Sequence, residues 1–550
     1  MTRIRRWALR TTTGDRAELK ELPDRSLLWD RVSTDAEGCV GERCDHYEDC
    51  FVIQARRRAA RADIVIINHH LFFADLAIKE RSEFSLLPVA DAVILDEAHG
   101  IEDVATRYFG RSVSDARLRR LIHDAMRAFR ERPGTRALIE RLGREITAAA
   151  STLFEPLRAL SRRRLAPSDL HQDLRSAWFA VDDAVESLQE LLESYRDRDE
   201  LVNRLCERAT SLRRDLEVLI TFSDPSLVVW VEQAERATFL KGALIDVAQL
   251  FQEVLLPRFP TLVFTSATLA TEGSFTHLKE RWGLDETLEQ VIASPFDYTK
   301  QALLFVPGDH PEPRDSAFPE ATAALVTRLV SLTEGNALVL FTSHANMERV
   351  YRMARASVAF PCLIQGEAPK EVLLTRFRSE PGSVLFATGT FWEGIDVVGE
   401  ACSAVIIDKL PFAPPDDPIT SARLDRLRER GMHPFSTYQI PAAIIALKQG
   451  VGRLIRNRSD RGLIAICDVR LLRSGYGRRF MRSLPPARSV TGLPELNAAW
   501  EDLHVVFLKQ SRPSTPLEEV TAADADSGDP HDESAEPKTN PGGDPSAVGG

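Results

Sequence analysis

Short runs of apolar residues, each followed by polar residues, recur along this chain. Residues 93–95 form such a run, and Asp96 and Glu97 follow it directly. Residues 261–268 have the same character, because their apolar half gives way to hydroxyl side chains. Short uninterrupted apolar runs are typical of strands that are buried on both faces of a parallel sheet. We therefore predict two strands of one α/β domain here, with residues 62–68 as a third candidate.

A second series of apolar runs occupies the C-terminal half of the chain. These runs alternate with amphipathic helical segments, which is the order expected of βα units in a parallel, doubly wound sheet. We predict a second α/β domain over residues 301–510. Its predicted strands are residues 337–341, 384–387, 404–407 and 463–466.

Between two halves of the first α/β domain, the periodicity becomes helical. Apolar residues recur at the three- and four-residue steps of one helix face, as in Ala177, Val181, Val185, Leu188 and Leu192. We predict an all-helical insertion. The predicted segments are a cysteine-containing region at 1–60, the first α/β domain at 61–110 and 241–300, the insertion at 111–240, the second α/β domain at 301–510 and a tail at 511–550.

Composition narrows the class of protein. Of 550 residues, 44% are apolar and 27% charged, and no apolar run approaches the roughly 18 residues that cross a bilayer. No signal-peptide pattern follows the basic N-terminus, so we expect a cytoplasmic protein. Of the net charge of -11, residues 511–550 contribute -7, from nine acidic and two basic side chains. This tail is predicted to be disordered, and the remainder is balanced enough to include a basic groove.

The polar residues at the predicted strand ends suggest nucleotide chemistry, because ligands bind at the carboxyl ends of strands in open α/β sheets. Asp96 is predicted to hold Mg2+, an ion that prefers oxygen ligands. Glu97 is predicted to orient and deprotonate an attacking water. The hydroxyls of Ser266 and Thr268 fall at the same predicted edge, where they can bond to the acids and register a γ-phosphate.

Two arginines of the second domain have a spacing that suits phosphate chemistry. Arg453 and Arg456 lie three residues apart, and we predict that they share one face of a helical turn. Planar guanidinium groups at this spacing can clamp a transferring phosphoryl group. A solvated helix face is the alternative explanation, although two neighbouring glycines and a glutamine count against it.

Three of the seven cysteines crowd together as Cys39, Cys44 and Cys50. In a cytosolic protein, such clustering favours a metal over disulfides. Structural zinc and cubane iron–sulfur sites usually take four ligands, so one ligand is missing, and His46 is a candidate for it. The pattern alone leaves metal binding and plain thiols both open.

Five segments, taken in order, resemble motifs II to VI of superfamily-two helicases, specifically of the DinG/XPD-type iron–sulfur DNA helicases. A further segment, A-S-P-F-D-Y at 293–298, resembles the bacterial DinG branch. The five segments are D-E-A-H at 96–99, T-S-A-T-L at 265–269, L-V-L-F-T-S at 338–343, T-G-T-F-W-E-G-I-D at 388–396 and Q-G-V-G-R-L-I-R at 449–456.

The resemblance implies two RecA-like motor domains that hydrolyse ATP with Mg2+ and move 5′ to 3′ on single-stranded or forked DNA in repair or replication. It also implies a 4Fe-4S cluster on the three clustered cysteines, and we expect a monomer without a membrane partner. The implied catalytic residues are Asp96, Glu97, Arg453 and Arg456. The implied nucleotide-binding residues are His99, Gly394, Asp396, Gln449 and Gly452. The implied coupling or DNA-contacting residues are Ser266, Thr268, Thr342, Ser343 and Thr388.

One motif of this family is absent from the sequence. The chain contains no G-x-x-x-x-G-K-[ST] segment and no Gly-Lys dipeptide, although that loop cradles the β- and γ-phosphates. We expect the loop, the first strand and a fourth cysteine to lie upstream of residue 1, so that the first motor domain is incomplete at its N-terminus and hydrolysis is very weak. The alternatives are a non-catalytic nucleic-acid-binding or interaction subunit that retains the motor fold, and a zinc-binding regulator.

Overall fold

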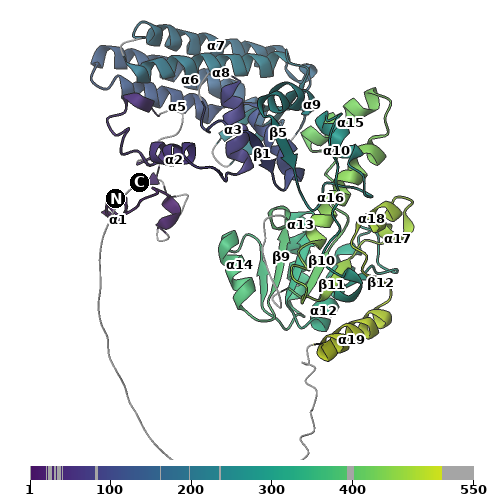
Figure 1. The fold of residues 1–550 in the computed structure, drawn as a ribbon. Helices are drawn as coiled ribbons and strands as arrows, with labels where there is room; N and C mark the ends of the chain where they lie inside the picture. Colours follow the sequence, from purple (N-terminus) through teal and green to yellow (C-terminus); the bar gives the residue numbers. More distant parts are fainter. Residues whose placement is uncertain are drawn as a thin grey trace, which may run out of the picture. The chain divides into compact units, whose positions relative to one another are not determined.

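The computed structural model describes most of the chain (Figure 1). The described residues are 2–19, 22, 26, 28–29, 32–33, 39, 41–80, 85–161, 163–196, 199–234, 237–392 and 402–510. The tail predicted at 511–550 lies outside the described residues. The chain forms two units, residues 1–500 and 501–550, and helix α19 (Leu493–Gln510) spans the boundary between them.

A small parallel sheet consists of β1 (Ala92–Leu95) and β5 (Thr261–Phe264). Both strands were predicted from their apolar runs, and both predictions are confirmed. The pairing continues beyond the strands, because Thr265 N donates to Leu95 O and Ala98 N donates to Thr265 O, each at 3.0 Å. The chain segments that leave the two strands therefore run side by side.

Helices pack against this small sheet, and large apolar side chains fill the space between them. Phe73, Phe251 and Trp282 share one buried cluster with Leu95 of β1 and Ile101 of α4. The helical elements of this region are α3 (His69–Lys79), η4 (Ala98–Gly100), α4 (Ile101–Tyr108), α9 (Ala248–Leu250), η6 (Phe251–Leu255), η7 (Leu256–Arg258), α10 (Thr276–Trp282) and α11 (Tyr298–Gln301).

The third predicted strand, residues 62–68, is wrong. Ile64 and Ile66 are 81% and 93% exposed, and this segment pairs with no strand in the described part of the chain. Asn68 instead caps α3, because its side chain accepts a hydrogen bond from Leu71 N. An apolar run becomes a buried strand only where a neighbouring strand accepts its backbone hydrogen bonds. The segment is preceded by α1 (Thr2–Ala8), η1 (Arg16–Glu18), η3 (Gly41–Arg43) and α2 (Phe51–Ala60).

Four long helices dominate the insertion, and Figure 1 shows α6, α7 and α8 lying alongside one another. The predicted helix face is confirmed, since Val181, Val185 and Leu188 are each at most 1% exposed. These side chains belong to one large core that the helices share. The helices are α5 (Asp115–Ala128), α6 (Pro133–Arg158), α7 (Gln172–Glu193) and α8 (Glu200–Thr221), with the short η5 (Pro167–Asp169) between α6 and α7.

The prediction of an all-helical insertion needs a correction. A three-stranded antiparallel sheet, in the order β2-β4-β3, begins and ends this region. The strands are β2 (Arg111–Ser114), β3 (Leu227–Ala234) and β4 (Ala237–Leu244). Val229 and Val231 of β3 pack into the helical core, whereas Val228 faces Ala422 of a later helix. This alternation between two faces is the period-two pattern of a strand.

A seven-stranded sheet forms the second α/β domain, in the order β12-β6-β11-β10-β7-β9-β8 with every pair parallel. The doubly wound prediction is confirmed, and β7, β9, β10 and β11 are the four predicted strands. The strands are β6 (Ala302–Phe305), β7 (Ala337–Phe341), β8 (Cys362–Ile364), β9 (Val384–Thr388), β10 (Ala404–Ile407), β11 (Gly462–Ile466) and β12 (Arg488–Val490). The helices are α12 (Phe318–Leu332), α13 (His344–Arg355), α14 (Lys370–Ser379), η8 (Gly389–Phe391), α15 (Pro418–Glu429), η10 (Phe435–Gln439), α16 (Ile440–Val451), α17 (Arg470–Arg473) and α18 (Gly477–Ser483).

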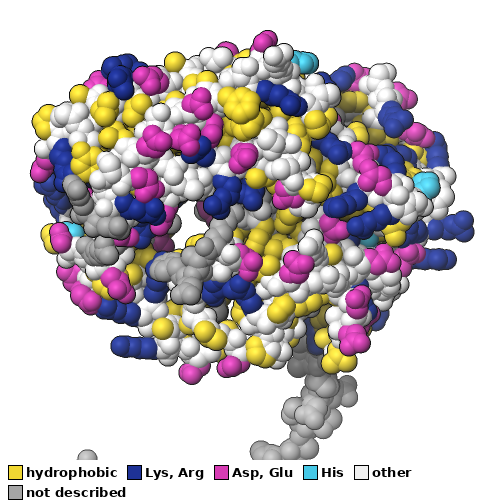
Figure 2. Space-filling view, turned by 90° about the horizontal axis from the view of Figure 1, so that it is seen from above, with side chains coloured by type: hydrophobic (Ala, Val, Ile, Leu, Met, Phe, Trp, Pro, Cys, Tyr) yellow, Lys and Arg dark blue, Asp and Glu magenta, His cyan; other side chains and the backbone are white. Residues whose placement is uncertain are grey.

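The surface mixes charges of both signs. Figure 2 shows Lys and Arg side chains interspersed with Asp and Glu over one face of the protein. This agrees with the near balance of charge outside the acidic tail. Among the helices that the structure describes, none has the length and apolar character needed to cross a membrane.

Candidate active site

The small sheet brings two of the motif segments into contact. Asp96 and Glu97 follow β1, and Ser266 follows β5 one residue beyond the continued pairing. Ser266 Oγ donates to Glu97 Oε2 at 2.7 Å, and His99 Nδ1 lies 3.0 Å from the same hydroxyl. Thr268 Oγ1 is 3.3 Å from Ser266 Oγ, so the hydroxyl pair and the acid form one hydrogen-bonded group.

Glu97 is held as a carboxylate by its surroundings. The hydrogen bond with His99 is the largest cause, and together with Ser266 and the nearby charge of Arg453 it lowers the pKa of Glu97 to about 2. The backbone of Glu97 adopts φ 49° and ψ 44°, the left-handed region that non-glycine residues rarely occupy. Such strained residues cluster at functional sites. At neutral pH this side chain is therefore an ionised, fixed acceptor.

Asp96 is exposed at the carboxyl end of β1. Its carboxylate is the kind of oxygen ligand that Mg2+ prefers. His69, at the start of α3, lies close enough to hydrogen-bond with the Asp96 backbone, and burial is the main cause of its lowered pKa. An exposed carboxylate at this strand end is compatible with binding Mg2+ together with water and nucleotide oxygens.

Arg453 approaches this group from the second domain. Its charge is one of the causes of the low pKa of Glu97, and its Nε donates to Trp392 O at 3.0 Å. Gly450 allows the Trp392 ring to pack against α16, because a Cβ there would lie 2.9 Å from that ring. The Arg453 guanidinium of the second domain therefore interacts electrostatically with the Glu97 carboxylate of the first domain.

The predicted placement of Arg453 and Arg456 on one helical turn is wrong. Helix α16 ends at Val451 with Gly452 as its C-cap, so both arginines lie in the segment beyond it. Glycine near a helix end favours such termination. The charge of Arg456 acts on Tyr298 and Cys402, where it lowers the pKa of each group against the larger effect of burial. Arg453 therefore acts on Glu97, whereas Arg456 acts on Tyr298 and Cys402.

A second polar group lies at the carboxyl edge of the seven-stranded sheet, where β7 runs between β9 and β10. Ser343 caps α13, since its Oγ accepts from Asn346 N at 3.2 Å. Thr388, at the end of β9, lies 3.1 Å from His344 Nε2. Thr342 and Ser343 follow β7 beside Thr388 at the end of β9, so the three residues lie at one edge of the sheet.

Comparisons with known proteins show which family this chain belongs to. A family profile described as "Helicase C-terminal domain" matches residues 326–487. ATP-dependent DNA helicase YoaA of Escherichia coli (strain K12) is 38% identical over 489 residues, which cover 88% of this chain and 76% of that protein. The chain belongs to the DinG/XPD-type helicase family.

A second relative from the DinG/XPD-type family supports the same assignment. ATP-dependent helicase DinG of Mycobacterium tuberculosis (strain ATCC 25618 / H37Rv) is 31% identical over 514 residues, covering 90% of this chain and 75% of that protein. Among solved structures, "XPD_Helicase" superimposes with a TM-score of 0.52 at 16% identity, covering 81% of this chain and 77% of that one. That structure shares the fold, with its two parallel-sheet domains. The chain is thus an enzyme of the ATP-dependent helicase type.

The cluster site that the DinG/XPD-type resemblance implies on the three clustered cysteines is not confirmed in the described part of the chain. Cys39 is exposed, Cys44 and Cys50 are half-buried, and all three are free thiols. Within the described ranges, no group of three His, Cys, Asp or Glu residues is placed to hold a metal ion. The described geometry does not fit a 4Fe-4S cluster, which stays a prediction from the sequence.

The remaining residues predicted from the DinG/XPD-type motifs fall into two groups. Gln449 is buried on α16, and Gly452 caps that helix. Gly394 and Asp396 lie outside the described residues.

Two features of this DinG/XPD-type chain were missed in the sequence. Asp408 directly follows the β10 run A-V-I-I, just as Asp96 follows A-V-I-L, so the same strand-end signal was available. Glu102 on α4 is buried and ion-paired with Arg281 Nη2 at 2.5 Å and Arg423 Nη2 at 2.8 Å. The ion pairs of Glu102 could not be predicted from a local sequence pattern, because Arg281 and Arg423 are far from Glu102 in the chain.

Proposed function

We propose that this chain couples ATP hydrolysis to 5′ to 3′ movement along single-stranded DNA and to the opening of forked DNA, in repair or replication. Two relatives at 38% and 31% identity are named as an ATP-dependent DNA helicase and an ATP-dependent helicase. The observation that carries the proposal is Glu97, which is ionised, hydrogen-bonded to Ser266 and close to the charge of Arg453.

In the proposed reaction, the Glu97 carboxylate accepts a hydrogen bond from the attacking water and takes its proton. Mg2+, held through Asp96, supplies charge neutralisation at the phosphates when it is bound. Arg453 stabilises the negative charge that develops on the transferred phosphoryl group. These three groups act together only when a triphosphate is held between them.

Ser266 links the reaction to the rest of the proposed cycle. Its hydroxyl donates to Glu97 and also accepts from Thr268 N at 3.2 Å. When Glu97 changes its hydrogen bonding to water and γ-phosphate, the Ser266–Thr268 turn must adjust. At the other sheet, Thr342, Ser343 and Thr388 are the proposed contacts to the DNA backbone, since hydroxyls and helix N-termini commonly bind phosphates. We propose that the protein acts as a monomer.

We further propose that the 550-residue chain hydrolyses ATP only weakly. Its sequence has no Gly-Lys dipeptide and hence no loop of the kind that cradles the β- and γ-phosphates. Without that loop, a nucleotide is held by the acids and Arg453 alone.

ATP turnover by the purified chain, with and without single-stranded DNA, tests both proposals. We expect slow turnover that falls at least about tenfold in Glu97→Gln, because a general base contributes several orders of magnitude. Glu272→Gln is the matched control, since Glu272 also has a left-handed backbone, at φ 52°, but pairs with Arg479. Vigorous turnover would disprove the weak-hydrolysis proposal, and turnover that survives in Glu97→Gln would disprove the role of Glu97. Any residual unwinding should favour forks with a 5′ arm over forks with a 3′ arm.

The absent phosphate loop also favours a second candidate, a non-catalytic DNA-binding subunit that keeps the motor fold. The two candidates differ in whether nucleotide changes DNA binding. A motor should bind a fluorescent single strand with different affinities in ATP and ADP, and that difference should persist in Glu97→Gln, because this variant slows hydrolysis and leaves ATP intact. A non-catalytic subunit should bind the strand equally in both nucleotides.

A further inference from the structure

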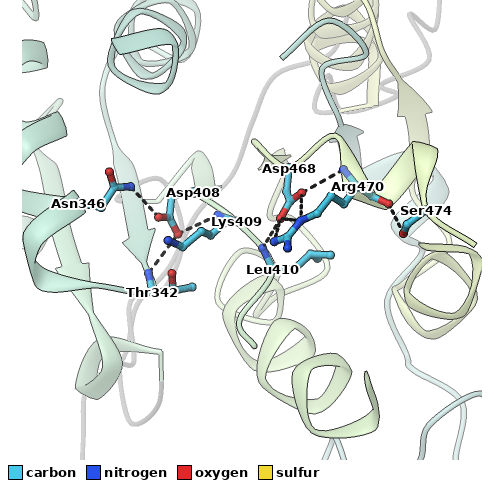
Figure 3. Close-up of polar contacts among 8 residues, drawn as sticks. All are labelled: Thr342, Asn346, Asp408, Lys409, Leu410, Asp468, Arg470 and Ser474. Atoms are coloured by element: carbon cyan, nitrogen blue, oxygen red, sulfur yellow. Dashed lines mark hydrogen bonds and ion pairs between the residues drawn. The ribbon is translucent and has the colours of Figure 1, made fainter. Parts of the chain in front are cut away.

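Asp408 is a fully buried carboxylate at the carboxyl end of β10. Three N–H groups converge on it, as Figure 3 shows. Its Oδ1 accepts from Thr342 N at 3.1 Å and from Lys409 N at 2.8 Å, and its Oδ2 accepts from Asn346 Nδ2 at 2.9 Å. The carboxylate therefore ties the end of β7 and the first turn of α13 to β10.

The turn that Asp408 holds carries the hydroxyls assigned above to the DNA backbone. Ser343 caps the same helix turn that Asn346 occupies, so the bond from Asn346 to Asp408 also sets the cap. Thr342 Oγ1 is buried and lacks a hydrogen-bond partner within the described residues. A buried hydroxyl without a partner is costly unless a ligand or water completes it.

The other side of the turn is held independently. His344 Nε2 lies 3.1 Å from Thr388 Oγ1, and Gln365 Oε1 accepts from Thr388 N at 2.6 Å. Strands β9 and β10 flank β7, so the turn is clamped from both neighbours. Only the β10 side depends on a single buried acidic side chain.

Asp468, one strand further along at the end of β11, is a natural comparison. It is also fully buried, but it accepts from Leu410 N at 2.9 Å and forms an ion pair with Arg470 at 2.7 Å. Figure 3 shows the two aspartates side by side on separate sets of partners. Asp468 thus has the burial of Asp408 without contact to the Thr342–Asn346 turn.

We propose that Asp408 is a positioning residue for nucleic-acid binding, which fixes the turn from Thr342 to Asn346 so that the Ser343 hydroxyl and the N-terminus of α13 meet one backbone phosphate of a single strand. This rests on the proposed function, because it assumes that the turn contacts DNA.

The role of Asp408 is geometric rather than electrostatic. Burial raises the pKa of Asp408 to about 6, because the charged carboxylate is less stable away from water. A negative charge is therefore disfavoured at this position, and the contribution of Asp408 is its set of hydrogen bonds. In Asp408→Asn, the side-chain oxygen can accept both backbone hydrogen bonds. The new amide nitrogen can donate to the Asn346 side-chain oxygen once the Asn346 amide has rotated by half a turn. Alanine can make none of these bonds.

Binding of fluorescein-labelled dT20 to the full 550-residue chain, followed by anisotropy, tests the proposal. Asp408→Ala should weaken binding about tenfold, Asn346→Ala a few-fold, and Asp408→Asn should restore affinity to within about twofold of the wild type. Asp468→Ala is the matched control and should bind as the wild type does. Because the proposed contact uses a hydroxyl and backbone N–H groups and no Lys or Arg, the slope of log affinity against log salt should stay close to the wild-type value in Asp408→Ala.

Each outcome has a separate meaning. If Asp408→Ala binds dT20 as Asp468→Ala does while both remain folded by thermal melting, the positioning role is wrong and the proposed function still stands. If Asp408→Ala does not fold, Asn346→Ala decides, and wild-type affinity in that variant would overturn the positioning role. If the wild type itself does not bind dT20, the proposed function fails.

Discussion

The two parallel sheets of this protein differ in how their strands are covered. In the seven-stranded sheet, every residue of β7, β9, β10 and β11 is buried. In the small sheet, only Leu95 of β1 is buried, and Ile94 and Val263 are 68% and 43% exposed. Parallel strands are normally covered on both faces. The small sheet, which carries the candidate active site, is therefore the less protected of the two.

The difference shows how the small sheet is supported. Its neighbour α4 contains Glu102, which is bound by Arg281 of α10 and by Arg423 of α15. Arg423 also donates to Ile245 O at 3.0 Å and to the Tyr438 hydroxyl at 3.1 Å. Arg281 and Arg423, which are distant in the sequence, thus stabilise the region around the small sheet, whose own strands are only partly buried. The seven-stranded sheet has a continuous apolar core of its own.

The largest effect should come from removing this external support. Arg423→Met leaves Glu102 with one partner and leaves the Ile245 carbonyl without its donor, so the free energy of unfolding should fall by about 3–5 kcal/mol. Hydrogen exchange should rise in α4 and β1 more than in β10. Asp425→Asn is the control, because the Arg164–Asp425 pair is about 40% exposed on both sides and should contribute less than about 1 kcal/mol. Equal effects of the two variants would remove the contrast between the sheets.

Matched substitutions in the two sheets test the contrast directly. Ile406→Ala in β10 empties a fully buried position and should cost about 2–5 kcal/mol. Ile94→Ala in β1 removes a side chain that is 68% exposed and should cost less than about 1 kcal/mol. Urea unfolding of both variants provides the two values. A large loss in Ile94→Ala would show that this face is covered in solution.

Acid should loosen the same support. Burial, with the charge of Arg281, lowers the pKa of His277 from 6.5 to about 4. The unfolded chain therefore takes up a proton at higher pH than the folded chain, and stability present above pH 6.5 is lost as the pH falls towards 4. Between pH 7.5 and pH 5 this amounts to up to about 2 kcal/mol. Thermal melting should show a smaller acid effect in His277→Gln, whereas the exposed His123→Gln should behave as the wild type does.

The smallest expected effect concerns strain at the edge of the small sheet. Glu97→Gly relieves a left-handed backbone, and the unfolding free energy should rise by about 1 kcal/mol or less, because the bond to Ser266 is lost at the same time. Glu272→Gly, at φ 52°, should gain a similar amount without affecting turnover. If Glu97→Gly is destabilised by more than about 1 kcal/mol, strain is not stored at this site.

Prediction from sequence succeeded where burial is a local property. The strands β7, β9, β10 and β11 were recognisable because a strand with apolar neighbours on both faces is apolar throughout. The strands β1 and β5 have the same apolar runs although their faces are partly exposed, and the fully buried β6 was missed. The edge strand β12 was missed, since two of its three residues are exposed and an edge needs no apolar run. Residues 62–68 have the apolar run without a strand to pair with, and their prediction failed.

In the candidate site, too, the contacts that follow from local sequence were predicted and those that depend on packing were not. The contact of Glu97 with Ser266 follows from two strand ends that meet at one edge of a sheet, which the motif order implied. The separate surroundings of Arg453 and Arg456 depend on α16 ending at Val451, and the sequence pattern placed them on one turn instead.

By itself, the sequence indicated most of the strands that have apolar runs, the family, and the acids and hydroxyls of the strand ends, because each depends on residues within a few positions of one another. Only the tertiary structure decided that Arg423 reaches Glu102 and that Asp408 holds the Thr342 turn. These contacts join residues that are distant in the chain, and their geometry is set by how whole helices and strands pack. No local pattern of apolar and polar positions records that packing.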